Sequence, residues 1–267
     1  MPDVWSAVAD LEPSQQERLA EVLETRGADP QQQELREAFL DGVEIPRGAR
    51  ALEVGCGTGV LTRRLAVRPD VRETVGVDVA PSLVERARAL SSGLRDLEFL
   101  TADARALPFD EGAFDLVVFD STLCHVPDAE RAVEESFRVL RPDGVLAAFD
   151  GDYSTVTVAL GRHDPLQTCV DAMVDGSVHD RWVMRRLPAV AASCGFAVGS
   201  YRSHGFVVTG GEYILSIVDR GIDLLAADGL LGDESAAALR VEARRRVDAG
   251  VFFGHIGYLS LVARRPG

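Results

Sequence analysis

The sequence predicts an α/β protein whose mostly parallel sheet is doubly wound, with helices on both faces. From residue 49 onward, short apolar runs alternate with segments of helical pattern, which is typical of such a sheet. The first run ends in the glycine-rich turn EVGCGTG, residues 53–59, directly before a helical segment. In such sheets ligands bind beyond the carboxyl ends of the strands, so we expect the functional site there.

The first half of the chain is expected to form two leading helices and five strands. The leading helices are expected at 13–27, between Pro13 and Gly27, and at 30–42. The five apolar runs that follow are ARALEV, ETVGVDV, LEFLTA, FDLVVFD and GVLAAFD. The helices between them are expected at about 58–68, 81–92 and 128–140.

The alternation changes after Asp150, where residues 153–182 show no strong strand pattern. Further helices are expected at about 183–194, 212–227 and 233–248, and the β segments 196–208 and 251–263 bring the sheet to seven strands. We therefore expect N-terminal helices that contribute to a cap, residues 1–44. The main domain is expected to span residues 45–267, with helical insertions at about 153–182 and 210–249.

The composition argues against several classes of partner and chemistry. A net charge of −14 disfavours nucleic acid and anionic membranes, both of which select basic surfaces. The chain has no lysine, which excludes Schiff-base and Walker-type lysine chemistry. No two of its cysteines have metal-ligand spacing, so we expect neither a metal site nor a disulfide framework; they are Cys56, Cys124, Cys169 and Cys194.

The N-terminal stretch MPDVWSAVADLEPSQQERLAEV has acids where a signal peptide would have bases and an apolar core. No apolar run approaches the ~20 residues that a membrane span needs. We therefore expect a soluble, cytoplasmic protein with no membrane partner.

The spacing of the glycines in EVGCGTG indicates which ligand the turn accepts. A dinucleotide fingerprint needs a third glycine at position 60, where this chain has Val60. Glu53, at the end of the first strand, would repel a pyrophosphate. Its carboxylate suits a ligand with a cationic group, such as the ammonium of an amino acid.

Two aspartates after the next strands complete the pattern. Asp78 ends the second strand, where a carboxylate can accept both ribose hydroxyls; a turn acid or a helix cap is the alternative. Asp103 follows the third strand and is placed to accept from an adenine amino group, with Val79 and Ala104 near the ring. Its alternative role is also a cap.

Taken in order, EVGCGTG, VDVA, TADARALPF, FDLVVFDSTLCHVPD and RVLRPDGVLAAFD resemble the motifs of class I S-adenosylmethionine-dependent methyltransferases. The small-molecule branch with ubiquinone- and menaquinone-type enzymes is the most similar. The resemblance covers about residues 45–150 and extends loosely to FFGHIGYLSLVARRP, which looks like the final strand of that family. It implies a Rossmann-like sheet with an antiparallel last strand. RPDG at 141–144 departs from the usual Pro-Gly-Gly.

The resemblance also implies a cofactor, S-adenosylmethionine, with S-adenosylhomocysteine as the product. It implies that Asp78 holds the ribose and that Glu53 lies near the ammonium of the cofactor. The remaining cofactor-binding positions that it implies are Gly55, Cys56 and Gly57 at the methionine part, Val79, Asp103 and Ala104 at the adenine, and Phe119 through its carbonyl.

Methyl transfer needs a general base only if the acceptor must lose a proton. His125 follows the fourth strand, Asp152 follows the fifth, and His179 lies in the irregular stretch before a helix. We expect these three as catalytic candidates; each has a structural alternative, as a buried histidine or a turn residue.

The fourth motif reads FDST, not the Asn/Asp-Pro-Pro-aromatic box that is typical of amino-group methylation of nucleobases or glutamine. An apolar pocket under the cap is expected to enclose a small-molecule acceptor, methylated on O, N or C, in specialised metabolism. Two alternatives stay open: a fold relative with a non-methylating reaction such as cyclisation, and a non-catalytic cofactor-binding regulator. The sequence does not define the oligomeric state.

Overall fold

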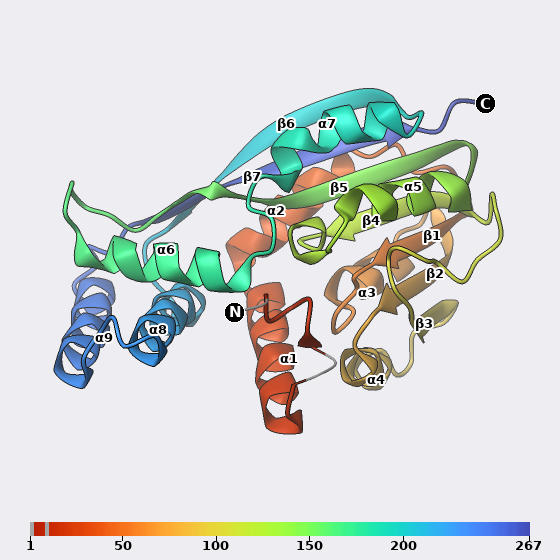
Figure 1. Ribbon diagram of the computed structural model, residues 1–267. Helices are drawn as coiled ribbons and strands as arrows, with labels where there is room; N and C mark the ends of the chain where they lie inside the picture. The colour runs from red at the N-terminus through yellow and green to blue at the C-terminus, as the bar shows by residue number, and fades with distance from the viewer. Residues whose placement is uncertain (1–2, 9–10) are drawn as a thin grey trace.

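The computed structural model describes residues 3–8 and 11–267, and residues 1, 2, 9 and 10 of the predicted N-terminal segment 1–44 lie outside it. A seven-stranded sheet forms its centre, with strand order β3-β2-β1-β4-β5-β7-β6 (Figure 1). The strands are β1 Ala49–Val54, β2 Val71–Asp78, β3 Leu97–Thr101, β4 Phe114–Asp120, β5 Leu140–Thr157, β6 Ala197–Val208 and β7 Gly254–Arg264.

The first five strands pair in parallel, and β7 runs antiparallel to both of its neighbours, β5 and β6. The parallel strands are almost continuous apolar runs, because helices cover both faces of such a sheet. The predicted doubly wound sheet with an antiparallel last strand is therefore confirmed.

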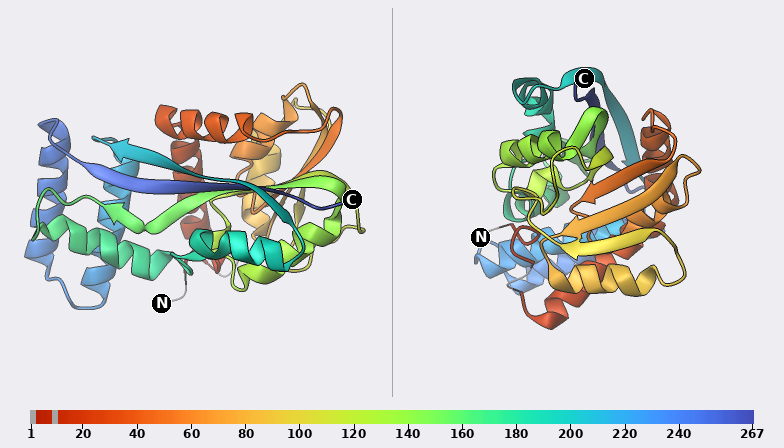
Figure 2. Two further views of the ribbon diagram at one scale, coloured as in Figure 1. Left: turned by 90° about the horizontal axis from the view of Figure 1, so that it is seen from above. Right: turned by 90° about the vertical axis from the view of Figure 1, so that its right-hand side faces the viewer.

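Helices pack on both faces of the sheet (Figure 2). Side chains of α5 and α7 share one apolar core with the strands, and side chains of α2 and α3 share the other. The helices are α1 Pro13–Ala28, α2 Pro30–Asp41, α3 Val60–Ala66, α4 Pro81–Leu90, α5 Ala129–Val139, α6 Pro165–Ser177, α7 Val183–Ser193, α8 Glu212–Ala227 and α9 Asp233–Asp248.

The main difference from the sequence-based prediction lies after Asp150. We expected the fifth strand to end there, but β5 continues to Thr157 and keeps pairing with β7 after its partner β4 has ended. The alternating stretch STVTV supplies this extension. RPDG, which departs from the usual Pro-Gly-Gly, lies inside the start of β5, with Asp143 in the left-handed region at φ 65°.

Helix α6 was not predicted as a separate element, although its start is marked in the sequence. Asp164 caps it by accepting from the backbone N–H of Leu166, and Pro165 occupies its first turn. Together with α8 and α9, it lies under the extended ends of β5 and β7 (Figure 1). These three helices pack against one another and form a helical layer beside the main sheet.

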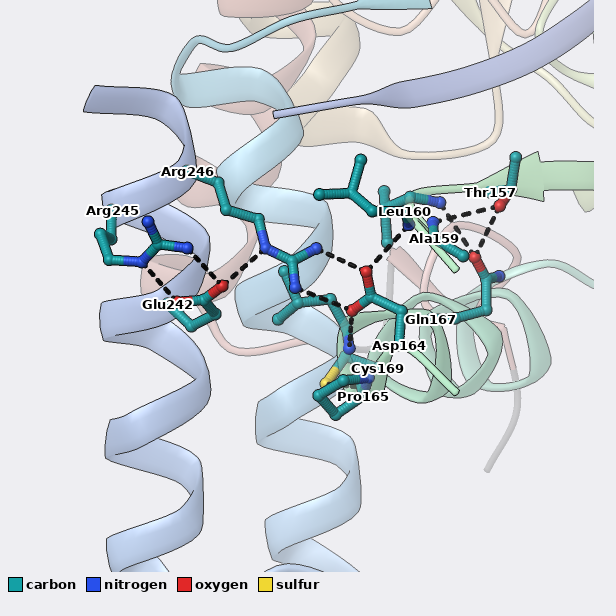
Figure 3. Close-up of polar contacts among 12 residues, drawn as sticks. Thr157, Ala159, Leu160, Asp164, Pro165, Gln167, Cys169, Glu242, Arg245 and Arg246 are labelled. Atoms are coloured by element: carbon teal, nitrogen blue, oxygen red, sulfur yellow. Dashed lines mark hydrogen bonds and ion pairs between the residues drawn. The ribbon is translucent and has the colours of Figure 1, made fainter. Parts of the chain in front are cut away.

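A buried ion pair fastens α9 to the beginning of α6 (Figure 3). The Arg246 guanidinium donates to both carboxylate oxygens of Asp164, at 2.6 and 3.1 Å, and to Glu242 on its own helix. The side chains of Asp164 and Arg246 are 4% and 10% exposed. Because Asp164 also accepts from the backbone N–H of Leu160, one carboxylate joins the β5–α6 loop, α6 and α9.

Candidate cofactor and acceptor site

A cavity of about 590 Å³ lies at the carboxyl ends of the parallel strands. Backbone and side chains that follow β1, β2, β3 and β4 form one end of it, which we call the cofactor end. Residues from α6 and α8 form the other, which we call the acceptor end. The N-terminal segment 4–8 and α1 contribute to both ends, because they also pack against α4, and Leu23 of α1 lies against Gly57. Its volume falls within the usual range for small-molecule and cofactor sites.

The glycine-rich turn lets the chain pass close to the cavity without side chains in the way. Gly55 and Gly57 both have positive φ, 73° and 52°. A Cβ at Gly55 would lie 2.1 Å from the Thr122 side chain, and one at Gly57 would lie 2.8 Å from Leu23. Any larger residue would therefore be strained and would collide with Thr122, just after β4, or with Leu23 of α1. This glycine cradle fits a ligand that must approach the backbone.

Glu53 lies at the floor of the cofactor end and is buried. Thr62 donates a hydrogen bond to it, and no arginine pairs with it among the described residues. Burial raises the pKa of Glu53 to about 8, so its carboxyl is largely protonated at neutral pH. A cationic ligand group would restore its charge.

Asp78 is positioned by backbone hydrogen bonds on both carboxylate oxygens. The N–H of Gly57 donates to one oxygen at 2.8 Å, and the N–H of Ala80 donates to the other at 2.9 Å. Burial raises the pKa of Asp78 in spite of these bonds. Each oxygen keeps a second lone pair for a ligand, so the carboxylate can accept from two adjacent hydroxyl groups.

The remaining predicted cofactor residues lie at or beside this end. Cys56, Val79 and Ala104 line the cavity, as does Asp103, whose carboxylate forms a bidentate ion pair with Arg105. Phe119 does not line it: its side chain is fully buried in β4, in register with Val54. The predicted role of its carbonyl stays a prediction.

A cluster of buried charges also lines the cavity. Arg36 of α2 donates to Asp120 at the end of β4, at 2.5 Å, and both side chains are buried. Burial opposes the charge of Asp120, but Arg36 and Arg26 lower its pKa. Arg26 of α1 is 9% exposed and donates to Ser121, while its Nε has no partner in the structure.

The N-terminal segment lies against the cavity and reaches His125. The imidazole Nδ1 of His125 is 2.7 Å from Asp3, whose side chain is 2% exposed. The same carboxylate accepts from the backbone N–H groups of Trp5 and His179. Trp5 lines the cavity, with its ring 5.9 Å from that of His125.

Of the three catalytic candidates, the structure brings only His125 to this cavity. Asp152 is buried outside the lining, where it accepts from Arg185 at 2.8 Å and from Ser154. His179 lies at a separate hollow of about 230 Å³, next to α5 and α7. The candidates that follow different strands therefore do not form one catalytic group.

Several residues of the site were missed by the sequence analysis. Asp3 and Trp5 come from a segment without motif or periodicity, and Arg26 lies in an ordinary polar helix. The one signal in the sequence was Gly27, next to Arg26, where a Cβ would lie 2.8 Å from Val60. The close approach of α1 to α3 at this point places Arg26 over the cavity.

The comparisons with known proteins agree with the geometry of the cofactor end. Residues 52–148 match the family described as methyltransferase domain. The resemblance to class I S-adenosylmethionine-dependent methyltransferases, of the small-molecule type, is therefore confirmed.

Two curated relatives illustrate how far the similarity extends. An uncharacterised 37.1 kDa protein from a Streptomyces fradiae transposon is 30% identical over 217 residues, which are 80% of this chain and 57% of that protein. A 2-phytyl-1,4-naphtoquinone methyltransferase of Thermosynechococcus vestitus is 38% identical over 116 residues, 43% of this chain and 52% of that enzyme. The chain thus spans about half the length of the curated relatives it matches.

Among solved structures, the cyclase SpnF has the same fold, with a TM-score of 0.62 and 22% identity, over 100% of this chain and 98% of its own. At that identity the likeness concerns the fold. No helix in the described part of the chain is long and apolar enough to cross a membrane. Within residues 3–8 and 11–267, no group of three or more His, Cys, Asp or Glu residues is arranged to hold a metal ion.

Proposed function

We propose that this protein transfers a methyl group from S-adenosylmethionine to an oxygen, nitrogen or carbon atom of a small molecule. The observation that carries the proposal is the cofactor end of the cavity. There a glycine cradle, a buried carboxyl at the end of β1 and an aspartate at the end of β2 line one space. This set suits an amino-acid ammonium beside a ribose.

The residues present fit the cofactor. Glu53 would hold its ammonium, Asp78 its ribose hydroxyls, and the lining around Val79 and Ala104 its adenine. When bound, S-adenosylmethionine supplies a methyl group that is already activated on a sulfonium. The chain has to align the acceptor with that methyl group and exclude water, and both are positional tasks.

His125 is the group at the acceptor end that is placed to take a proton. With Asp3 accepting from Nδ1, the imidazole is fixed in the tautomer that leaves Nε2 free as a base. The Asp3 carboxylate also stabilises the imidazolium that forms, as in other Asp–His pairs. Asp3 acts through His125 and is a positioning residue.

The acceptor end suits a partly apolar small molecule. Met173 and Val178, which adjoin Ser177, line it together with Trp5 and Ile217. The Ser177 hydroxyl is buried and has no partner in the structure. Such a wall with a few polar groups is typical of small-molecule pockets. The relative that acts on a naphthoquinone supports the same class of acceptor.

A second candidate function is a non-methylating reaction such as a cyclisation at the same site. This candidate is supported by the similarity in fold to the cyclase SpnF, which extends over the whole chain. A non-catalytic, cofactor-binding regulator is a third. Bound cofactor is common to all three, so binding alone does not separate them.

Transfer of a labelled methyl group separates them. The purified protein is incubated with methyl-labelled S-adenosylmethionine and extract of the source cells, beside the Asp78→Ala variant. We expect label in a low-mass fraction that depends on Asp78. Label in protein or RNA would overturn the acceptor class. Cofactor binding without any transfer would favour the other two functions.

A further inference from the structure

The Arg26 guanidinium is the feature of the cavity that the cofactor end does not explain. Arg26 lines the cavity from the last turn of α1 and is 9% exposed. It donates to a neutral hydroxyl, Ser121, and its buried Nε has no partner. Burying an arginine without an anion is costly, because a charge taken out of water needs compensation.

No carboxylate in the described part of the chain forms an ion pair with Arg26. Asp120 is the nearby acid, and its carboxylate is already taken by Arg36 at 2.5 Å and by Ser121. The other groups that face Arg26 are the phenols of Tyr153, Tyr213 and Tyr258. Two guanidinium charges therefore share one carboxylate at this point of the cavity.

The Glu53 carboxyl does not compensate the positive charge of Arg26. Because burial raises its pKa to about 8, its carboxyl is largely neutral in the empty site at pH 7. When the cofactor binds, the ammonium pairs with Glu53, so this carboxylate is not available to Arg26. Among the described residues at this point of the cavity, Arg26 is therefore the guanidinium without a carboxylate partner from the chain, and the carboxylate of the cofactor is the anion with which an acceptor would compete.

We propose that Arg26 binds an oxyanion on the acceptor, in the simplest case the carboxylate of an aromatic acid, and so selects anionic acceptors. This rests on the proposed function, since it concerns the acceptor end of that same site. An arginine donates two parallel hydrogen bonds to a carboxylate, and the free Nε is one of the donors of such a pair. The apolar side chains at the acceptor end would enclose the ring.

The test compares aromatic carboxylates with their neutral amides. Binding of 2-naphthoate and 2-naphthamide to the full chain, saturated with S-adenosylhomocysteine, is measured by calorimetry. We expect the acid to bind about 10- to 100-fold more tightly than the amide, the effect of a hydrogen-bonded pair with a charged group. Arg26→Gln should abolish most of this preference, and Arg26→Lys should retain part of it.

Arg18→Gln is the matched control. Arg18 lies on the same helix and also lines the cavity, but it is exposed at the rim. In Arg18→Gln, the preference for the acid over the amide should stay within about threefold of the wild-type value, because an exposed charge is screened by water and salt. A loss as large as that in Arg26→Gln would make the effect one of general charge and would contradict the proposal.

Three other outcomes would overturn it. Equal binding of acid and amide by the wild-type chain, or no saturable binding of the acid at millimolar concentration, would show that Arg26 does not select an anion. An Arg26→Gln variant that loses affinity for S-adenosylhomocysteine but keeps the acid preference would assign the guanidinium to the carboxylate of the cofactor. Failure to bind S-adenosylhomocysteine at all would instead count against the proposed function.

Discussion

The two ends of the cavity are built in different ways. At the cofactor end, each polar group lies within a few residues of the end of a parallel strand: Glu53 and Asp78 in the last residues of β1 and β2, and Asp103 just after β3. At the acceptor end, the groups come from the N-terminal segment and from helices far apart in the chain, such as Trp5, Arg26 and Tyr213. Strand topology fixes the first set, and tertiary packing fixes the second.

This difference indicates which part of the cavity determines the specificity for the acceptor. The cofactor end uses backbone geometry, as in the two N–H groups that hold Asp78, so it tolerates change in the rest of the molecule. The acceptor end depends on how α6 and α8 pack beside α1, so sequence changes in these helices alter the pocket for the acceptor. The predictions below separate the two ends, beginning with the largest expected effect.

Replacement of His125 should affect turnover and hardly change cofactor binding. We expect His125→Ala to lower kcat about 100-fold or more, the usual contribution of a general base. Asp3→Asn should give a smaller loss of kcat, because the imidazole keeps its place but loses the carboxylate that orients it. Steady-state kinetics on the labelled small-molecule product would measure both.

Asp152→Asn serves as the comparison, since Asp152 follows β5 but lies outside the lining of the cavity. A loss of turnover in Asp152→Asn equal to that in His125→Ala, with cofactor affinity intact, would show that the base is assigned to the wrong residue.

The helical layer that carries α6 and α9 can be weakened at its buried ion pair. Arg246→Met leaves the Asp164 carboxylate uncompensated, so we expect the free energy of unfolding to fall by about 3 kcal/mol. Arg244→Met, which breaks a pair with Asp219 that is more exposed, should cost less than about 1 kcal/mol. Urea unfolding measures both variants.

Affinity for S-adenosylhomocysteine should stay near the wild-type value in Arg246→Met, because the side-chain partners of Arg246 lie in the helical layer of α6, α8 and α9. Equal stability of the two variants would contradict the stabilising role of the Asp164–Arg246 ion pair. A large loss of affinity for S-adenosylhomocysteine would contradict the separation of the two ends of the cavity.

Asp78→Ala is the matching test of the cofactor end. Loss of a charged hydrogen-bond partner should weaken cofactor binding by about 1–3 kcal/mol, measured by calorimetry with S-adenosylhomocysteine. The preference for 2-naphthoate over 2-naphthamide should not change in this variant. Unchanged cofactor affinity would remove the ribose assignment.

Cofactor affinity should also depend on pH through Glu53. The pKa of Glu53 in the empty site is about 8, and the ligand ammonium favours the ionised form. Affinity for S-adenosylhomocysteine should therefore rise from pH 6 to pH 7, by at most about tenfold, with release of a proton. Glu53→Gln should flatten this dependence, and equal pH profiles of the two proteins would contradict it.

The same carboxyl affects stability in the opposite direction. Its folded pKa lies above the ordinary value of 4.5, so between pH 4.5 and about 8 the folded chain holds a proton that the unfolded chain has lost. Glu53 therefore makes the empty protein less stable as the pH rises through this window.

The sequence alone predicted the parallel sheet and the polar residues at its edge, because both depend on local patterns. The glycines at 55 and 57 and the acids at the strand ends are separated by fixed numbers of residues. The extension of β5 to Thr157 was missed because its partner β7 lies a hundred residues further along the chain. Likewise, the pairing of Asp3 with His125 joins residues 122 positions apart, and nothing local in the sequence indicates it.

The most direct measurement is a crystal structure of the protein with S-adenosylhomocysteine bound. The account predicts ribose hydroxyls within hydrogen-bond distance of Asp78, the ammonium beside Glu53, and the sulfur facing the space between His125 and Arg26. A ligand that leaves Asp78 and Glu53 without contacts, or one that fills the acceptor end, would contradict the division of the cavity into two ends.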